Sequence, residues 1–182
     1  MYLQFSPFPE LKTRRLVLRQ LTANDQNEIF FLRSDEAVNK YVDRPRPASV
    51  ADALAHIDRL NSGINKNELI FWGITFAGTP SIIGGIGIWN FSKEDSTAEV
   101  GFELAPEHQG KGIMTEAFHA VIRYAFDTIN ARRLLGWVHH EHIRSITLLR
   151  KFDFIRDTEE EKKATGLNNM VIYSLNAPAS SK

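Results

Sequence analysis

The segment Gln109–Met114, with the sequence QGKGIM, combines residue types that can bind a phosphate group. Gly110 and Gly112 would let the backbone approach an anion closely, Lys111 supplies positive charge, and a helical pattern follows at once. The first N–H groups of a helix have no partner within it, and the helix dipole is positive at that end. The segment therefore suits a phosphate or pyrophosphate, although an ordinary surface loop before a helix has the same appearance.

Two other phosphate-binding motifs are absent from the chain. The Walker motif requires serine or threonine after its lysine, whereas Lys111 is followed by Gly112. This absence argues against a nucleotide hydrolase. The dinucleotide motif requires G-x-G-x-x-G at the start of a helix, whereas the GGIG run at Gly84–Gly87 lies inside a strand pattern. We interpret that run as a bulge or a site of close backbone packing.

The composition limits the classes of protein to which the chain can belong. Its 182 residues are 43% hydrophobic and 24% charged, as expected for one soluble domain. Basic and acidic residues balance at 22 each, which argues against nucleic acid as a partner. The absence of cysteine excludes disulfides, thiolate metal sites and a cysteine nucleophile, and it fits the reducing cytoplasm. No apolar run reaches the length of a membrane span, so we expect a cytoplasmic protein without a membrane partner.

The hydrophobic pattern predicts the elements that must position the glycine-containing segment. Alternation predicts strands at 14–21, 69–76, 81–91, 97–104, 133–139 and 169–175, with another strand beginning at 154–156. Capping residues and helical spacing predict helices from 22–25, at 49–60, after the glycine segment up to 129, and at 143–152. The sum is an α+β fold, a mostly antiparallel sheet with one strand–helix–strand unit. We expect a single domain over residues 1–176 and a flexible tail at 177–182.

Residues 98–118, AEVGFELAPEHQGKGIMTEAF, resemble the cofactor-binding motif of the GNAT acetyltransferases, whose loop reads Q/R-x-x-G-x-G/A. Gln109 and Gly112 match its first and fourth positions, and Met114 stands where Gly or Ala is usual. The segments LKTRRLVLRQLTANDQNEIFFL and SITLLRKFDF resemble one branch, the Rim-type enzymes that acetylate ribosomal-protein N-termini. The resemblance covers nearly the whole chain.

Besides Met114, three positions depart from patterns common in the family. His142 stands where the branch usually has Asn, and Asp153 stands where it usually has Gly. Many GNAT enzymes have a tyrosine general acid at the position of Leu149, so a tyrosine acid at that position is excluded.

The resemblance implies a GNAT-like twisted sheet flanked by helices, and acetyl-CoA as the co-substrate. It implies that the backbone of the strand at 102–104 binds the pantetheine arm and that the pyrophosphate lies at the following helix N-terminus. The cofactor-binding residues implied in this way are Phe102, Glu103, Leu104, Gln109, Gly110, Lys111, Gly112, Ile113, Met114, Thr115, His142 and Ser145.

Acetyl transfer to an amine needs a base that removes a proton from the amine. Glu99 is the first candidate, because it precedes the loop on the same strand and matches a glutamate that the family often uses. Alternation places it on one face with Gly101 and Glu103, and Glu103 is the reserve candidate. A solvated strand carboxylate is the other interpretation of Glu99.

Three further side chains complete the predicted site. Ser145 matches the branch's serine and could hold the cofactor thiol or donate a proton to it, and a serine there could also satisfy backbone N–H groups of its helix. Tyr41, in a proline-rich loop, is predicted to contact the acceptor. The HHEH run at 139–142 lacks the spacing of a zinc site, so we expect no metal.

Two functions therefore remain open at this stage. The first is an N-acetyltransferase that moves the acetyl group of acetyl-CoA to a primary amine of a protein N-terminus or a small molecule. Without a cysteine, direct attack in a ternary complex is the simpler route. The second is a non-catalytic acyl-CoA-binding sensor or scaffold, which the departures at His142 and Asp153 favour. Either function is compatible with a monomer or a homodimer.

Overall fold

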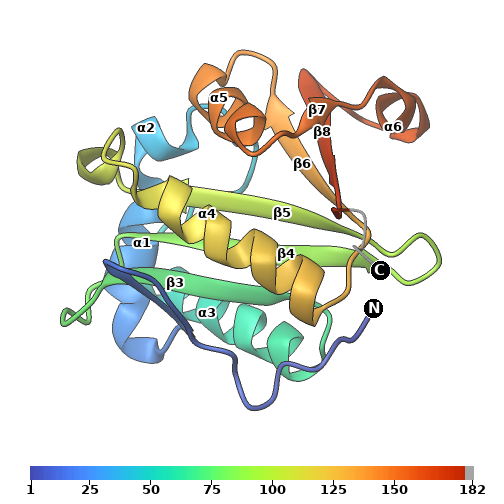
Figure 1. Ribbon diagram of the computed structural model, residues 1–182. Coiled ribbons are helices and arrows are strands. Elements are labelled where there is room, and N and C mark those ends of the chain that lie inside the picture. Colours follow the sequence, from blue (N-terminus) through green and yellow to red (C-terminus); the bar gives the residue numbers. More distant parts are fainter. Residues whose placement is uncertain (179–182) are drawn as a thin grey trace.

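Eight strands form one twisted sheet in the computed structural model, which describes residues 1–178 (Figure 1). Neighbouring strands run antiparallel except β5 and β6, which run parallel and are joined through α4. This arrangement confirms the predicted α+β class and its single strand–helix–strand unit. In sheet order the strands are β1 (Leu11–Lys12), β2 (Leu16–Arg19), β3 (Ile70–Phe76), β4 (Gly84–Ser92), β5 (Thr97–Leu104), β6 (Arg133–His139), β8 (Met170–Asn176) and β7 (Ile155–Arg156).

Helices cover both faces of this sheet. In Figure 1, α4 crosses the face toward the viewer, while α1 and α3 lie behind the sheet. Short turns of 3₁₀ helix precede α1 and α4, and a π-helical turn extends α4. The bounds are η1 (Ala23–Asp25), α1 (Gln26–Ser34), α2 (Glu36–Asn39), α3 (Val50–Asn65), η2 (Pro106–His108), α4 (Ile113–Arg123), η3 (Tyr124–Thr128), α5 (Ile143–Lys151) and α6 (Thr158–Lys163).

The predicted helix starts are confirmed by their capping residues. Ser49 and Asp52 form a reciprocal capping box at the start of α3, in which each side chain accepts from the other residue's backbone. Thr22 and Asp25 form the same arrangement before α1. The end of α3 was predicted wrongly, because the helix continues to Asn65 through Gly63, whose backbone packs against Leu69.

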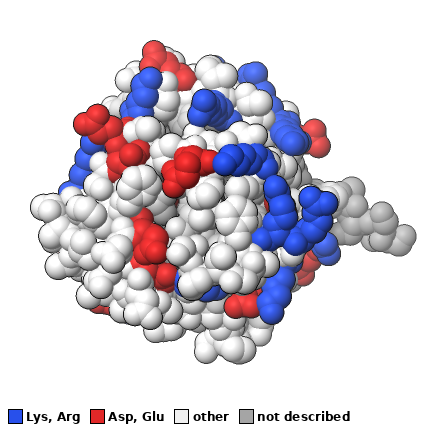
Figure 2. Space-filling view, turned by 90° about the vertical axis from the view of Figure 1, so that its left-hand side faces the viewer, with Lys and Arg blue, Asp and Glu red and all other residues white. Residues whose placement is uncertain are grey.

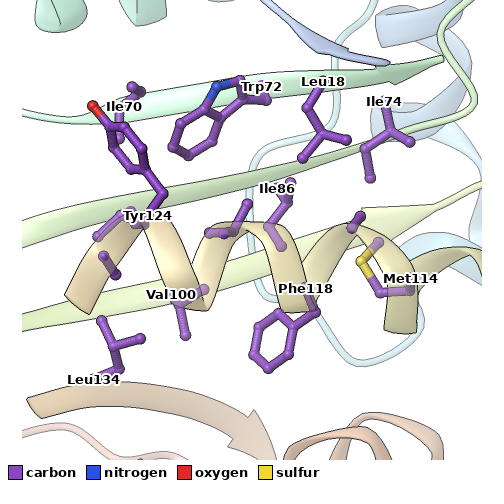
Figure 3. Close-up of a cluster of buried hydrophobic side chains, with 14 of the residues drawn as sticks. Leu18, Ile70, Trp72, Ile74, Ile86, Val100, Met114, Phe118, Tyr124 and Leu134 are labelled. Carbon is purple, nitrogen blue, oxygen red and sulfur yellow. The ribbon is translucent and has the colours of Figure 1, made fainter. Parts of the chain in front are cut away.

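The larger hydrophobic core lies between the sheet and α4 (Figure 3). Trp72 from β3, Val100 from β5 and Leu134 from β6 meet Phe118 and Tyr124 in this layer, and Trp72 and Phe118 are fully buried. Truncating a buried aromatic side chain of this size typically costs about 3–5 kcal/mol. This core therefore fixes α4, and with it the segment before α4, against β5.

A second core lies behind the sheet, under α1 and α3. It consists of Leu21, Ile29, Leu32, Ala53, Ile57, Ile82 and Ala105. Glycines on this face make room for two large aromatic side chains. A Cβ atom built on Gly85 would lie 2.3 Å from the ring of Phe71, and one built on Gly101 would lie 2.3 Å from the ring of Trp89. The close packing predicted for the GGIG run is confirmed, with side chains resting on its backbone.

Several boundaries differ from the sequence prediction. β2 and β4 are shorter than predicted, and the short elements β1, α2 and α6 were not predicted. Hydrophobic periodicity does not reveal such short elements, because two to six residues contain too few repeats of the pattern. Of the predicted flexible tail at 177–182, residues 179–182 lie outside the described residues. Within residues 1–178, no helix has the length and apolar character that crossing a membrane requires.

Candidate functional site

The strands β5 and β6 separate halfway along β5. Their register pairs only Thr97, Ala98 and Glu99 of β5 with β6. From Val100 to Leu104, β5 pairs with β4 alone, and Figure 1 shows β6 diverging from it. The second edge of this half of β5 therefore has backbone N–H and C=O groups without a strand partner, which can bind the amide groups of an extended ligand.

The unpaired edge leads into the glycine loop, Gln109–Gly112, and then into α4. Gly110 and Gly112 have φ angles of +73° and +71°, a left-handed conformation that favours glycine. Among residues 1–178, the six successive backbone N–H groups of 110–115 donate to no protein acceptor. A Cβ atom on Gly110 would meet nothing within 4 Å, so the space over the loop is open. The predicted anion site thus has its donors and room for a ligand.

Basic side chains surround the glycine loop. Lys111 and Arg144 are exposed beside it, and a side-chain nitrogen of Arg15 would lie 3.7 Å from a Cβ atom on Gly112. Figure 2 faces the end of the molecule where α4 begins and shows Lys and Arg side chains gathered mainly toward the α4 side. Arg15 was missed by the sequence analysis, because it lies 97 positions before Gly112 and β2 brings it there.

Glu116 holds Arg15 in place from the first turn of α4. Its carboxylate accepts hydrogen bonds from Thr13 Oγ1 (2.6 Å), Arg15 N (2.8 Å) and Arg15 Nε (2.7 Å). Burial opposes the negative charge, but these hydrogen bonds outweigh it and keep the pKa of the Glu116 carboxyl below its usual value. The one acidic side chain in this turn is therefore already matched by Arg15 and does not cancel the charge of Lys111.

Both polar atoms of the Gln109 side chain form hydrogen bonds within the protein. Its Nε2 donates to the Leu104 carbonyl (3.0 Å), and its Oε1 accepts from Arg144 (2.8 Å). The side chain thus ties the end of β5 to the start of α5. The side chains of Ile113 and Met114 are buried, so these two residues can offer a ligand only their backbone N–H groups. Thr115 is partly buried in the same turn.

Glu99 and Trp89 form a hydrogen-bonded pair on the α1–α3 face of the sheet. The two residues are directly opposite in the β4–β5 register, and Trp89 Nε1 donates to Glu99 Oε2 (3.1 Å). In residues 1–178, Oε1 of Glu99 has no hydrogen-bond or ion-pair partner. The sequence analysis placed Gly101 and Glu103 on the face of Glu99 but did not predict its hydrogen bond to the indole N–H of Trp89.

Glu103 lies on the same face but has a different partner. Arg44 donates to its Oε2 at 2.6 Å, and both side chains are at most 20% exposed. Because this carboxylate is already ion-paired, it is less suited than Glu99 to accept a proton from a ligand. Phe102 points the other way and packs edge-on against Phe118 with ring centroids 5.4 Å apart.

Tyr41 and His142 lie side by side at the end of β6. Their ring centroids are 4.7 Å apart, and His139 lies 5.3 Å from Tyr41. His142 is the N-cap of α5, and burial together with nearby Arg144 and His139 lowers the pKa of its imidazole. Ser145, in the first turn of α5, is partly buried, and its hydroxyl makes no hydrogen bond to residues 1–178. The alternative interpretation of Ser145 as a backbone cap therefore does not apply.

Trp137 is a further residue that the sequence analysis missed. Strand alternation places it on the same face as Leu135, which pairs with Glu99. Its Nε1 is buried and has no acceptor among the described residues, and it lies two residues beyond the last β5–β6 pair. A buried N–H without a partner is costly, so a bound ligand at this place would supply a missing acceptor.

Residues 15–155 match the family described as the acetyltransferase (GNAT) domain. YoaA of Bacillus subtilis (strain 168), an uncharacterized N-acetyltransferase, is 31% identical over 150 residues, which cover 82% of this chain and 85% of YoaA. An uncharacterized N-acetyltransferase of Bacillus licheniformis, p20, is 31% identical over 157 residues, or 84% of this chain and 88% of p20.

Solved structures of acetyltransferases have the same fold. The ribosomal-protein-S5-alanine acetyltransferase of Vibrio fischeri has a TM-score of 0.76 at 18% identity, over 92% of this chain and 96% of that one. The microcin C7 self-immunity acetyltransferase MccE, solved with acetyl-CoA and AMP, has a TM-score of 0.76 at 20% identity, over 91% and 94%. These similarities confirm the predicted GNAT-like fold. With a family match that spans well over half of its length, the chain belongs to the GNAT family of acetyltransferases, whose acetyl donor is acetyl-CoA.

Proposed function

We propose that this acetyltransferase moves the acetyl group of acetyl-CoA to a primary amine while both substrates are bound. The observation that carries the proposal is the half-unpaired strand β5, which holds Glu99 at the point where β6 separates from it and ends at the glycine loop. A ligand bound along this edge would be extended between a carboxylate and an anion site. That order of groups suits a long thioester donor with a diphosphate at its far end.

The residues near β5 and α4 fit acetyl-CoA. The unpaired N–H groups of 110–115 and the open space over Gly110 match a diphosphate, and Lys111 and Arg15 supply positive charge. The unpaired edge of Phe102–Leu104 matches the amides of the pantetheine arm. When bound, acetyl-CoA supplies an acetyl group activated as a thioester.

Glu99 is the proposed general base. Trp89 holds Oε2 of its carboxylate, which leaves Oε1 to take a proton from the amine directly or through a water molecule. Ser145 is the proposed hydrogen-bond partner of the cofactor thiol. Thiols such as that of the free cysteine side chain have a pKa of about 8.5, so the leaving group needs little help from an acid.

The acceptor is proposed to enter from the α1–α3 face, where Glu99 and Trp89 lie. Tyr41, packed on His142, is proposed to contact it. The names of the structural neighbours support two kinds of acceptor, a ribosomal-protein N-terminus and a small molecule. The lack of cysteine is consistent with action in the cytoplasm.

Two measurements together test this function. Titration calorimetry with acetyl-CoA reports binding, and a free-thiol assay over a panel of primary amines reports transfer. We expect saturable binding and thiol release that depends on the amine. Binding without release for any amine would instead favour a non-catalytic acyl-CoA-binding module.

A further inference from the structure

Three arginines lie on the elements behind the sheet, on the face opposite to α4. Arg33 is in the last turn of α1, Arg59 is in α3, and Arg44 is in the connection between α2 and α3. The helices α1 and α3 pack against each other through the core that contains Leu32 and Ile57. We call Arg33, Arg44 and Arg59 the arginine cluster.

The members of this cluster differ in how they are bound. Arg44 is anchored, because its Nε donates to Asn39 Oδ1 (2.7 Å) and its NH2 group donates to Glu103 Oε2 (2.6 Å). Arg33 is partly buried, and neither Arg33 nor Arg59 has a hydrogen-bond or ion-pair partner among residues 1–178. Of the three arginines, only Arg44 is ion-paired with Glu103.

A partly buried guanidinium without a partner is unfavourable, because it has lost water without gaining an acceptor. Burial and the positive charges of Arg44 and Arg59 lower the pKa of the Arg33 guanidinium, although the negative charge of Glu103 opposes the shift. His56 in α3 experiences the same field, since burial and the charges of Arg33, Arg59 and Arg44 lower its pKa to about 4. An anion placed among these groups would relieve both effects.

The cluster lies on the acceptor side of the proposed reaction. Arg44 contacts Glu103, which shares its strand face with Glu99 and Trp89. Glu99 and Glu103 are four residues apart, or about 13 Å along a strand that rises about 3.3 Å per residue. An acceptor of moderate length could therefore reach both places.

We propose that the arginine cluster binds an anionic group, a carboxylate or a phosphate, on the acceptor whose amine is acetylated. This inference rests on the amine acetylation proposed above and names the class of its substrate. The anion accepts hydrogen bonds from Arg33 and Arg59, while Arg44 stays fixed on Glu103. Such charge-assisted bonds typically change affinity by about tenfold to a hundredfold.

The activity test uses pairs of amines that differ in one charge. The pairs are ω-amino acids of two to eight carbons with their amides, and O-phosphoethanolamine with ethanolamine. We expect kcat/KM for the acid to exceed that of its amide at least tenfold at the best chain length. The two kinds of pair distinguish a carboxylate from a phosphate. Equal kcat/KM within every pair would overturn the proposal.

The variants assign this preference to the cluster. We expect Arg33→Gln combined with Arg59→Gln to bring the ratio of acid to amide close to one, with little change for the amide. The matched control is Arg46→Gln, an exposed arginine in the same connection as Arg44, and it should keep the ratio. A ratio that survives in the double variant would contradict the assignment.

A binding test separates this proposal from the acetyl transfer itself. The ring signals of His56, assigned among the six histidines with His56→Gln, are followed by NMR while inorganic phosphate or 6-aminohexanoate is added. We expect these signals to shift and the His56 pKa to rise in the wild type, and neither to change in the double arginine variant. If no amine is acetylated, the transfer proposal fails, while this titration still decides on the anion site. Absent or equal shifts in both proteins would overturn it.

Discussion

The glycine loop and the arginine cluster are both suited to anions, but they are built from different parts of the chain. The glycine loop offers six backbone N–H groups in one continuous segment, with exposed basic side chains around it. The arginine cluster uses side chains from α1, α3 and the connection before α3. A backbone site depends on local conformation, whereas a side-chain site depends on how distant elements pack.

This difference has a consequence for specificity. Substitutions in the glycine loop leave its N–H groups in place unless they alter the backbone. The site for acetyl-CoA can therefore stay constant while other residues change. At Arg33 or Arg59 a single substitution removes the group that contacts the ligand, and the second core beneath them is untouched. One fold can thus keep acetyl-CoA as the acetyl donor while the amine that accepts the acetyl group varies.

Glu99→Gln is the change with the largest expected effect, because it removes the proposed base between these two regions. The amide keeps the shape and the acceptor oxygen for Trp89, but it cannot take up a proton. We expect turnover to fall by about a hundredfold or more, the usual scale for a lost general base. Steady-state kinetics with one amine, together with acetyl-CoA titration, measures both quantities.

The control for Glu99 is Glu94→Gln, an exposed glutamate in the turn between β4 and β5, which should leave turnover unchanged. The residual rate of Glu99→Gln should rise with pH, because higher pH supplies more unprotonated amine. If turnover barely changes, the base lies elsewhere. If acetyl-CoA affinity falls in step with turnover, Glu99 supports the strand and transfers no proton.

Gly112→Val tests the backbone site. Gly112 has φ of +71°, and Gly78, in the turn after β3, has φ of +85° with open space around it. Both valine variants bear the strain of a left-handed residue, about 1–2 kcal/mol. Only Gly112→Val should also lower acetyl-CoA affinity, by about tenfold or more, because its side chain enters the space over the N–H groups. Equal affinities of the two variants by calorimetry would refute the anion site.

The sequence predicted the backbone site and most of the fold for the same reason, since both are local. Hydrophobic periodicity and capping pairs lie within a few residues of the elements that they specify, as at Ser49 and Asp52. The arginine cluster gave no such signal. Its members lie at positions 33, 44 and 59, and only the packing of α1, α3 and the connection between them brings these residues to one side of the sheet, where Arg44 contacts Glu103.

The Trp89–Glu99 pair shows why even neighbouring strands can mislead. Ser92 pairs with Thr97, so counting two residues back along β4 and two forward along the antiparallel β5 would place Asn90 opposite Glu99. A bulge shifts the register by one residue, and Asn90 adopts a φ of +50° within it. Asparagine tolerates that conformation, but nothing in the sequence requires it here. The indole N–H therefore reaches Glu99 through an irregularity that alternation alone does not reveal.

His56 tests the electrostatics of the arginine cluster through stability. Its pKa is about 4 in the fold, below the ordinary value of 6.5, so the neutral ring is favoured. The contribution is complete above pH 6.5 and is lost as pH falls toward 4, because the unfolded chain then binds more protons. We expect a loss of about 1 kcal/mol between pH 7 and pH 5, after allowance for partial exposure.

Urea unfolding of the wild type and His56→Gln at these two pH values measures that loss. The variant should be less sensitive to pH in this window, whereas the lowered pKa values of Asp25, Glu116, Asp157 and Glu161 affect stability at lower pH in both proteins. Arg33→Gln should weaken the effect as well, since it removes one of the charges that act on His56. The same pH dependence in wild type and His56→Gln would show that burial and the arginines do not lower the pKa of His56 in the fold.

Lys111→Ala should have the smallest effect, and it sharpens the contrast between the two regions. Lys111 is exposed, so its attraction to a diphosphate is screened by salt, unlike that of the partly buried Arg33. We expect acetyl-CoA affinity to fall about two- to threefold at low ionic strength and the loss to shrink in 0.5 M salt. Lys93→Ala, in the turn between β4 and β5, should leave affinity unchanged. The acid-over-amide preference should decline less over the same salt range in its Arg33 part, because Arg33 is partly buried, whereas Arg59 is exposed. A loss for Lys111→Ala that is independent of salt would mean that Lys111 binds the ligand through fixed geometry, and the distinction between a backbone site with screened charges and a built arginine site would then no longer hold.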